Sequence, residues 1–364
     1  MRELYIDQIK WLKKSIEVNS MKGSCAFYSP IWPYMKSGFF WSKPYPETSG
    51  YLIETLIDYQ NYDNQLELYD YISSIVHWLL DIQLPSGSFP GGLGDKGRES
   101  FFNTGQILLG LIKYYKISPS FRIEESIIRA YEWLLSAIDT NGLVCRGHYI
   151  QNFSPDYYSR VLWPMLMIER EFNLSNSNKI LLCIKKILSN FDNDSCIFKA
   201  WSFNRDKPAF THTIAYTLRG LLESSRLLKD EFISIEIGNI VYNSFAKILT
   251  DLNNNNFIIG ALDKNGRSDN SFICVTGHFQ LSIVSFLLNK YSLLNDNYFS
   301  SKKLFNTAKE GIANSSNFFL LKGGINGSIP FHSKYLRFRQ PNWAVKFYLD
   351  NLLLLLQNNK LYKE

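Results

Sequence analysis

The sequence predicts an all-α fold, a closed (α/α)6 toroid in which six helical hairpins form inner and outer rings of helices joined by short β-like turns. One observation is a unit that recurs along all 364 residues: an amphipathic helix, a small turn and a more apolar helix. A second is the spacing of the apolar helices, whose expected starts lie 55, 53, 55, 64 and 66 residues apart. These starts lie near Gly50, Gly105, Tyr158, Thr213, Gly277 and Trp343. The third is their number, because six hairpins close a ring.

The first helix of each unit carries charged residues on one face and apolar residues at positions i, i+3 and i+4 on the other, as helices of an outer layer do. We expect these outer helices at 3–18, 66–83, 124–138, 177–190, 230–249 and 300–316. A small turn follows each of them and leads to a bulky apolar residue. The six turns begin at Gly23, Ser86, Asn141, Asp194, Asn255 and Asn326.

The second helix of each unit is apolar on nearly all sides, as in 107–112 and 281–288, and such helices are typically buried. No Pro-, Gly- or Ser-rich linker divides the chain, so we expect one domain spanning 1–364. An open solenoid of the same hairpins is the main alternative. In a closed ring, the N-terminal ends of the inner helices converge on one end, where their free amides favour anionic or hydroxyl-rich ligands. The loops leading there are 24–50, 88–104, 145–158, 198–213, 259–277 and 328–343.

Composition narrows the classes of protein. Hydrophobic residues make up 46% and charged residues 20%, which permits a large core and argues against disorder. The net charge of +6 is spread without a basic stripe, so nucleic acid is not an expected partner. Five scattered cysteines without a CxxC motif indicate reduced thiols rather than disulfides or a zinc site. With no signal-peptide pattern or membrane-length apolar stretch, we expect a cytoplasmic protein without a metal or cofactor.

One turn carries a recognisable motif. Gln83, Gly87 and Phe89 resemble the QW repeat, Q-x3-G-x-W, of terpenoid cyclases and protein prenyltransferase β-subunits, with Phe in place of Trp. In that superfamily the repeat ties outer helices to turns around an α/α ring. The chain has neither a DxDD acid motif nor the Cys/His/Asp zinc set of those enzymes. The resemblance therefore supports the fold and weakens terpenoid chemistry.

A second resemblance covers more of the chain. The segments 100–111, 208–224, 275–283 and 326–353 look like a group of toroid proteins encoded among bacterial surface-polysaccharide genes, described as prenyltransferase-like or six-hairpin-glycosidase-like. This resemblance implies a carbohydrate context and no particular reaction, because a fold hosts many functions.

Two histidines at the starts of inner helices are candidate catalytic residues. His212, Tyr216 and Arg219 share one helix face, and together they can take a proton α to a carboxylate or bind a uronic acid. An N-terminal capping cluster is the structural alternative. His278 occupies the matching place on the next inner helix. Sugar 2-epimerases on this fold resemble this pattern, since they use a pair of histidines as acid and base.

Glycoside hydrolysis calls for two carboxyls, and several loop acids can reach the proposed site. We single out Asp156, which precedes two tyrosines and Arg160, and Glu54, which lies one turn into a buried helix. The other acids considered are Glu47, Asp95, Glu99, Asp206, Asp263 and Asp269. Each acid taken alone is more often a helix cap or a loop residue.

Arginines recur in nearly every loop that enters the proposed site, and their planar forks suit carboxylate or phosphate. The arginines we assign to substrate binding are Arg98, Arg146, Arg160, Arg205, Arg219, Arg267 and Arg337, with Arg339 in the same loop as the last. Surface salt bridging is their structural alternative. Aromatic and amide side chains among these loops would stack against sugars or hydrogen-bond to them. Those we name are Trp32, Tyr34, Trp41, Tyr149, Trp201, Tyr335, Asn342 and Trp343.

The mixture of arginines, aromatics and acids predicts a glycoside hydrolase or polysaccharide lyase that acts on an acidic oligo- or polysaccharide in bacterial surface-polysaccharide metabolism. A non-catalytic glycan-binding or scaffold protein of polysaccharide assembly is an alternative, and so is a sugar epimerase. A terpenoid cyclase-like enzyme predicts instead a dry aromatic cavity without arginine.

Overall fold

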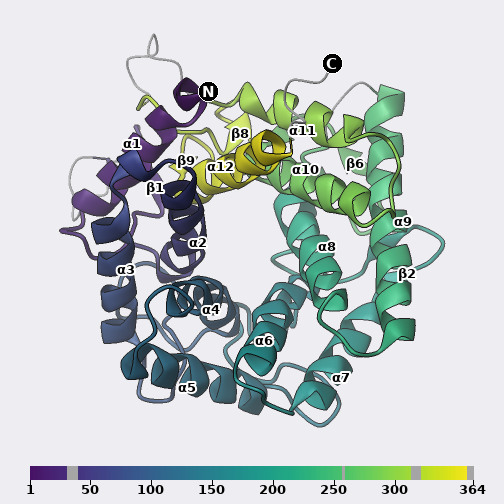
Figure 1. Cartoon of the computed structure of the whole chain (residues 1–364). Helices are drawn as coiled ribbons and strands as arrows, with labels where there is room; N and C mark the ends of the chain where they lie inside the picture. Colours follow the sequence, from purple (N-terminus) through teal and green to yellow (C-terminus); the bar gives the residue numbers. More distant parts are fainter. Residues whose placement is uncertain (31–39, 256–258, 313–320, 359–364) are drawn as a thin grey trace.

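The computed structural model describes residues 1–30, 40–255, 259–312 and 321–358. These residues form twelve α-helices that alternate between an outer and an inner ring around a common axis (Figure 1). The chain runs once around the ring, so the yellow C-terminal helix lies beside the purple N-terminal segment. The predicted (α/α)6 toroid is confirmed.

Six helices form the inner ring. Each contacts the next in sequence, and the last contacts the first, which closes the ring and excludes an open solenoid. The inner helices are α2 (Pro46–Tyr62), α4 (Phe101–Tyr115), α6 (Ser159–Glu171), α8 (Thr211–Ser225), α10 (Val275–Lys290) and α12 (Asn342–Gln357). They are buried over most of their length, as their nearly continuous apolar sequences require.

The outer ring presents one charged face to solvent. Its helices are α1 (Ile6–Glu17), α3 (Tyr69–Ile82), α5 (Phe121–Ala137), α7 (Ser177–Leu188), α9 (Glu231–Asn255) and α11 (Phe299–Lys309). The last is shorter than predicted, since it ends at Lys309, and 313–316 lie outside the described residues. Short 3-10 turns also occur, at η1 (Arg2–Leu4), η2 (Asn64–Leu66) and η3 (Asp156–Tyr158). Within the described ranges, no helix is long and apolar enough to cross a membrane.

Short antiparallel strands hold together the loops at one end of the ring. β4 (Ala209–Phe210), β5 (Ala261–Leu262) and β6 (Ser268–Asp269) form one sheet, and β7 (Ile273–Cys274) pairs with β8 (Ser328–Ile329). β1 (Phe27–Tyr28) pairs with β9 (Gln340–Pro341), which joins the first loop to the last. β2 (Phe191–Asp192) and β3 (Ile197–Phe198) form a hairpin after α7. Because each strand pair spans neighbouring hairpins or one turn, the loops that precede the inner helices are fixed in place.

The QW-like motif performs the linking role that its resemblance implies. The Gln83 side chain donates hydrogen bonds from Nε2 to the Gly87 carbonyl at 2.7 Å and to the Ser126 carbonyl at 2.9 Å. It therefore joins the end of α3 to the following turn and to α5. Phe89, which replaces the tryptophan of the motif, is fully buried.

Glycines allow the inner helices α2 and α4 to approach each other closely. A Cβ atom at Gly110 would lie 2.0 Å from the Gly50 carbonyl oxygen and 2.9 Å from the Ile53 Cβ. No side chain fits in that space, so the pair of helices depends on glycine at this position.

Gly110→Ala is expected to destabilise the protein by about 1–3 kcal/mol, because overpacking outweighs the better helix propensity of alanine. Gly238→Ala on the outer helix α9 is the matched control, since its Cβ would meet only Leu293 at 3.4 Å. Urea denaturation of both variants measures the difference. Equal stability of the two variants would contradict the close packing.

Candidate active site

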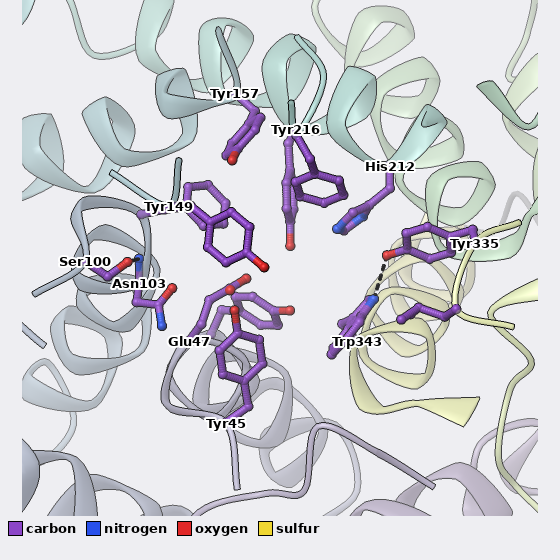
Figure 2. A pocket seen from close by; sticks show the side chains of 14 residues that line it. Tyr45, Glu47, Ser100, Asn103, Tyr149, Tyr157, His212, Tyr216, Tyr335 and Trp343 are labelled. Carbon is purple, nitrogen blue, oxygen red and sulfur yellow. Dashed lines mark hydrogen bonds between the residues drawn. The ribbon is translucent and has the colours of Figure 1, made fainter. Parts of the chain in front are cut away.

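A cavity of about 320 Å³ opens at the N-terminal ends of the inner helices (Figure 2). Its described lining is mostly aromatic, and six of the nine aromatic side chains are tyrosines. The lining residues are Tyr45, Glu47, Tyr51, Ser100, Phe102, Asn103, Tyr149, Tyr157, Phe203, His212, Tyr216, Tyr335, Leu336 and Trp343. Among these described residues there is one carboxyl and one imidazole, and both belong to the first turn of an inner helix.

Glu47 is the carboxyl of the cavity. It is the second residue of α2, after Pro46, and its side chain is 7% exposed. Burial raises its pKa to about 7, although the Tyr45 hydroxyl and the Arg160 guanidinium act to lower it. A carboxyl with this pKa gives or takes a proton near neutral pH, which is the property of a general acid or base.

His212 is the imidazole of the cavity and the second residue of α8. Its Nδ1 lies 2.8 Å from the Gln280 Oε1, an acceptor, so Nδ1 carries the proton and Nε2 keeps a free lone pair. Burial lowers the pKa of His212 to about 3, against the raising effect of Gln280, and the nearby Arg160 lowers it further. The imidazole is therefore neutral at physiological pH, and it points into the cavity in Figure 2.

Tyrosine hydroxyls surround these two groups. The Tyr216 ring centroid lies 4.3 Å from that of His212, and its hydroxyl points into the cavity (Figure 2). The Tyr51 and Tyr216 hydroxyls are buried beside each other, and no other group among the described residues bonds to them. Beside His212, whose ring centroid lies 5.5 Å from that of Tyr335, Trp343 Nε1 donates to the Tyr335 hydroxyl at 2.9 Å. The cavity therefore combines flat apolar faces with several hydroxyls, as a binding site for a sugar ring requires.

Five residues predicted for the site lie together in this cavity: Tyr149, His212, Tyr216, Tyr335 and Trp343. Arg160 is beneath it. The Arg160 side chain is fully buried, and its guanidinium carbon lies 4.8 Å from the centroid of the Tyr216 ring. Its Nε donates to the Gln106 Oε1 at 2.6 Å.

Asp156 and His278 do not line the cavity. Asp156 is buried, and its two oxygens accept from Asn190 Nδ2 at 2.6 Å and from the Ala200 amide at 2.8 Å, so it fastens η3 to the β2–β3 hairpin. Its pKa is raised to about 7 by burial. His278 Nδ1 donates to the Cys274 carbonyl at 2.9 Å. His212 and His278 therefore do not face one cavity, contrary to the predicted pairing.

Glu54 and Arg219 lie further along the inner helices, in a second cavity of about 240 Å³ at the other end of the ring. This cavity holds a charged cluster in which Lys346 pairs with Asp350, and Arg219 lies 3.7 Å from Glu223. Arg219 follows Tyr216 by only three residues, but α8 carries its side chain toward the opposite end. The predicted trio of His212, Tyr216 and Arg219 is therefore divided between two cavities.

The loop arginines do not converge on the aromatic cavity. Those whose side chains are exposed and outside its described lining are Arg98, Arg146, Arg205, Arg267 and Arg337. Local partners hold some of them: Arg146 donates to Ser136 Oγ at 2.6 Å, and Arg205 donates to the Asn152 carbonyl at 3.2 Å. Arg339 lies over the ring of Phe27 at 4.5 Å. Long arginine side chains at the surface keep their guanidinium groups in contact with water or with nearby polar groups.

Trp201 and Asn342 have packing contacts instead. Trp201 is 3% exposed and packs against Phe198. Asn342 Nδ2 donates to Ser24 Oγ and to Thr48 Oγ1, which connects α12 to α2 where the ring closes. Of the predicted stacking aromatics, Trp32 and Tyr34 lie outside the described residues.

The sequence did not predict most of the residues that line the cavity. It indicated Glu47 only as one of several loop acids. One feature of the sequence does indicate the lining, namely the second residue of each inner helix. That position holds Glu47, Phe102, Arg160, His212, Thr276 and Trp343, and four of these six residues line the cavity. Within the described ranges, no three His, Cys, Asp or Glu side chains are placed to hold a metal ion.

The pKa of Glu47 has a consequence for stability. It rises from 4.5 to about 7 on folding, so the folded state binds this proton more tightly than the unfolded state does. Stability is therefore highest below the unfolded pKa and falls as the pH rises through the folded pKa, by roughly 3 kcal/mol in all. We expect Glu47→Gln to stabilise the protein at about pH 8 and not at about pH 4, as measured by urea denaturation. An equal effect at both pH values would contradict the raised pKa.

With the geometry established, comparison with known proteins defines the class of the fold. No family model matches the chain, and no curated protein matches its sequence. Solved structures match it over nearly their whole length, and they share its (α/α)6 toroid.

Three of these structures illustrate the range of activities described for proteins with this fold. One, described as an unsaturated glucuronyl hydrolase specific for heparin, has a TM-score of 0.64 and 14% identity, and the match covers 96% of this chain and 98% of that one. A polysaccharide lyase matches with a TM-score of 0.66 and 12% identity, over 99% and 98% of the two chains. A sugar epimerase from a ruminal bacterium matches with a TM-score of 0.68 and 12% identity, over 98% and 97%. Identities this low establish the fold alone.

Proposed function

We propose that this chain is a carbohydrate-active enzyme, a polysaccharide lyase or glycoside hydrolase, that cleaves an acidic glycan in the aromatic cavity. The observation that carries the proposal is the pairing of Glu47, whose pKa is about 7, with the neutral His212 in one tyrosine-rich cavity. Two groups with such separated pKa values form an acid and a base at the same pH. The names of the matched structures, a hydrolase, a lyase and an epimerase, agree with proton-transfer chemistry on sugars.

The composition of the site favours elimination. The free Nε2 of His212 takes the proton α to the carboxylate of a uronic acid residue, and the bond from the adjacent carbon to the glycosidic oxygen breaks. The protonated carboxyl of Glu47 donates its proton to that leaving oxygen, so a double bond forms and no water is consumed. The usual hydrolytic mechanism uses two carboxyls across the scissile bond, and the described lining contains one.

The aromatic lining without arginine also matches the cavity expected of a terpenoid cyclase. The polar groups favour the sugar, however, because a cyclase protects a reactive cation from nucleophiles and water. Tyrosine hydroxyls, Ser100 and Asn103 line this cavity beside Glu47 and His212. The cavity volume, about 320 Å³, is at the small end for ligand sites and suits the end of an oligosaccharide.

The experiment is incubation of the protein with a panel of acidic and neutral bacterial polysaccharides, followed by mass spectrometry and ultraviolet absorbance. Fragments that absorb as unsaturated uronates indicate a lyase, and fragments heavier by one water indicate a hydrolase. Binding without any product indicates a non-catalytic glycan-binding or scaffold protein and would overturn the enzyme proposal. An altered sugar within an intact chain indicates an epimerase.

We include a cytoplasmic location in the proposal. The five cysteines are free thiols, and Cys145 is exposed, which suits a reducing compartment. Labelling of the intact chain from either side of the cell envelope tests this location.

A further inference from the structure

The guanidinium of Arg160 is a buried positive charge without an ionic partner. Its Nη1 and Nη2 have no hydrogen-bond partner among the described residues, and none of the ion pairs within those residues includes it. Arginine does not lose its proton in proteins, and an unpaired buried charge is costly. The rings of Tyr216, Trp163 and Phe347 lie 4.8, 5.6 and 5.6 Å from the guanidinium, and cation–π contacts offset part of that cost.

Two tyrosines of the cavity wall interact with this charge. Tyr51 and Tyr216 are each 1% exposed and both line the cavity, and within the described residues their hydroxyls have no hydrogen-bond partner except each other. This mutual contact leaves part of the hydrogen-bonding capacity of the two buried hydroxyls unused, which is costly, and both can turn to donate to an acceptor that enters the cavity. Two such donors above a positive charge suit an anionic acceptor.

The one acidic group of the described lining is Glu47. The titratable groups that face it are Tyr45 and Tyr51 from its own segment, Tyr149 from the loop before η3, Tyr157 from η3, Arg160 from α6, His212 and Tyr216 from α8, and Tyr335 from the last loop. Arg160 is the only cation among them, since His212 is neutral. A second negative charge in the cavity would repel the Glu47 carboxylate and favour its protonated form.

We propose that the floor of the cavity is a carboxylate subsite for a uronic acid residue. In it the hydroxyls of Tyr51 and Tyr216 donate to the carboxylate, the buried Arg160 balances its charge, and Glu47 takes a proton from solvent as the sugar binds. This inference rests on the proposed function and identifies the side chains that hold the carboxylate of its substrate. The proton taken up on binding is the one that Glu47 later gives to the leaving oxygen. Binding of an acidic sugar therefore protonates the catalytic acid.

Titration calorimetry with methyl glucuronide and methyl glucoside tests the subsite. Run at alkaline pH in two buffers that differ in heat of ionisation, it reports both affinity and proton uptake. We expect the glucuronide to bind more tightly than the glucoside by roughly tenfold or more, with proton uptake for the glucuronide alone. Equal affinity, no binding of the glucuronide, or binding without proton uptake would overturn the proposal.

Isosteric variants locate the subsite. Tyr51→Phe should lower the affinity for the glucuronide by roughly tenfold and leave the affinity for the glucoside unchanged. Tyr69→Phe, which removes an exposed tyrosine hydroxyl on the outer helix α3, is the control and should change neither affinity. Glu47→Gln should abolish proton uptake and retain binding. Loss of binding of both sugars in Tyr51→Phe, or loss of glucuronide binding in Tyr69→Phe, would place the carboxylate elsewhere.

The subsite and the enzyme proposal fail in different ways. Selective glucuronide binding with proton uptake, but no turnover of any glycan, overturns the enzyme and retains the subsite. Turnover of a glycan without selectivity for the glucuronide overturns the subsite and retains the enzyme.

Discussion

Glu47→Gln is expected to lower kcat on the cleaved glycan by roughly 10²- to 10⁴-fold, the contribution typical of a general acid. The amide has the shape of the carboxyl and still fits beside Tyr45, but it has no proton to give to the leaving oxygen. Steady-state kinetics on the glycan identified in the panel measures the loss, and KM should change much less than kcat.

Glu54→Gln is the matched control for Glu47→Gln. Both acids belong to α2, but Glu54 faces the charged cavity at the other end of the ring. We expect turnover by Glu54→Gln to equal that of the unmodified protein. Loss of activity in Glu54→Gln, with activity kept in Glu47→Gln, would place the active site in the charged cavity. It would contradict the assignment of the active site to the aromatic cavity.

His212→Asn is expected to reduce kcat/KM by roughly 10²- to 10⁴-fold, because the base that removes the α proton is lost. The pH dependence follows from the same two groups. Burial lowers the pKa of His212 to about 3 and raises that of Glu47 to about 7, so the neutral base and the protonated acid coexist between these values. Activity should fall above about pH 7 as Glu47 loses its proton, and below about pH 3 as His212 gains one.

His278→Asn is the control for the histidine. This side chain is buried on α10, with its Nδ1 bonded to the Cys274 carbonyl, and it does not line the aromatic cavity. Its replacement can lower the stability but should keep the pH profile of kcat/KM. A shift of the falling limb in His278→Asn, or none in Glu47→Gln, would contradict the assignment of that limb to Glu47.

The fold was predictable because its determinants are local and repeated. The apolar helices recur at a regular spacing, and all six begin within four residues of the positions expected from Gly50 onward. Gln83 shows the same principle, since a short motif encodes a link between two outer helices and a turn. Closure of the ring was harder to predict from the sequence. It depends on contacts between residues far apart in the chain, such as the hydrogen bond from Asn342 to Thr48.

The candidate site was only partly predictable. His212 and Trp343 were found because the loops before inner helices converge on one end, and both lie there. The arginines were misplaced because residue type in a loop does not fix side-chain direction: Arg146 turns outward to Ser136, whereas Arg160 is buried beneath the cavity. The raised pKa of Glu47 follows from burial by residues far apart in the sequence, and composition alone could not reveal it.

The crystal structure of the Glu47→Gln protein with an acidic oligosaccharide cleaved by the unmodified enzyme tests the central claim most directly. We predict a sugar in the aromatic cavity at the N-terminal ends of the inner helices, with the scissile linkage between position 47 and His212 and a carboxylate on the hydroxyls of Tyr51 and Tyr216. A sugar bound instead in the charged cavity of Glu54, Arg219 and Lys346, with the aromatic cavity empty, would contradict it.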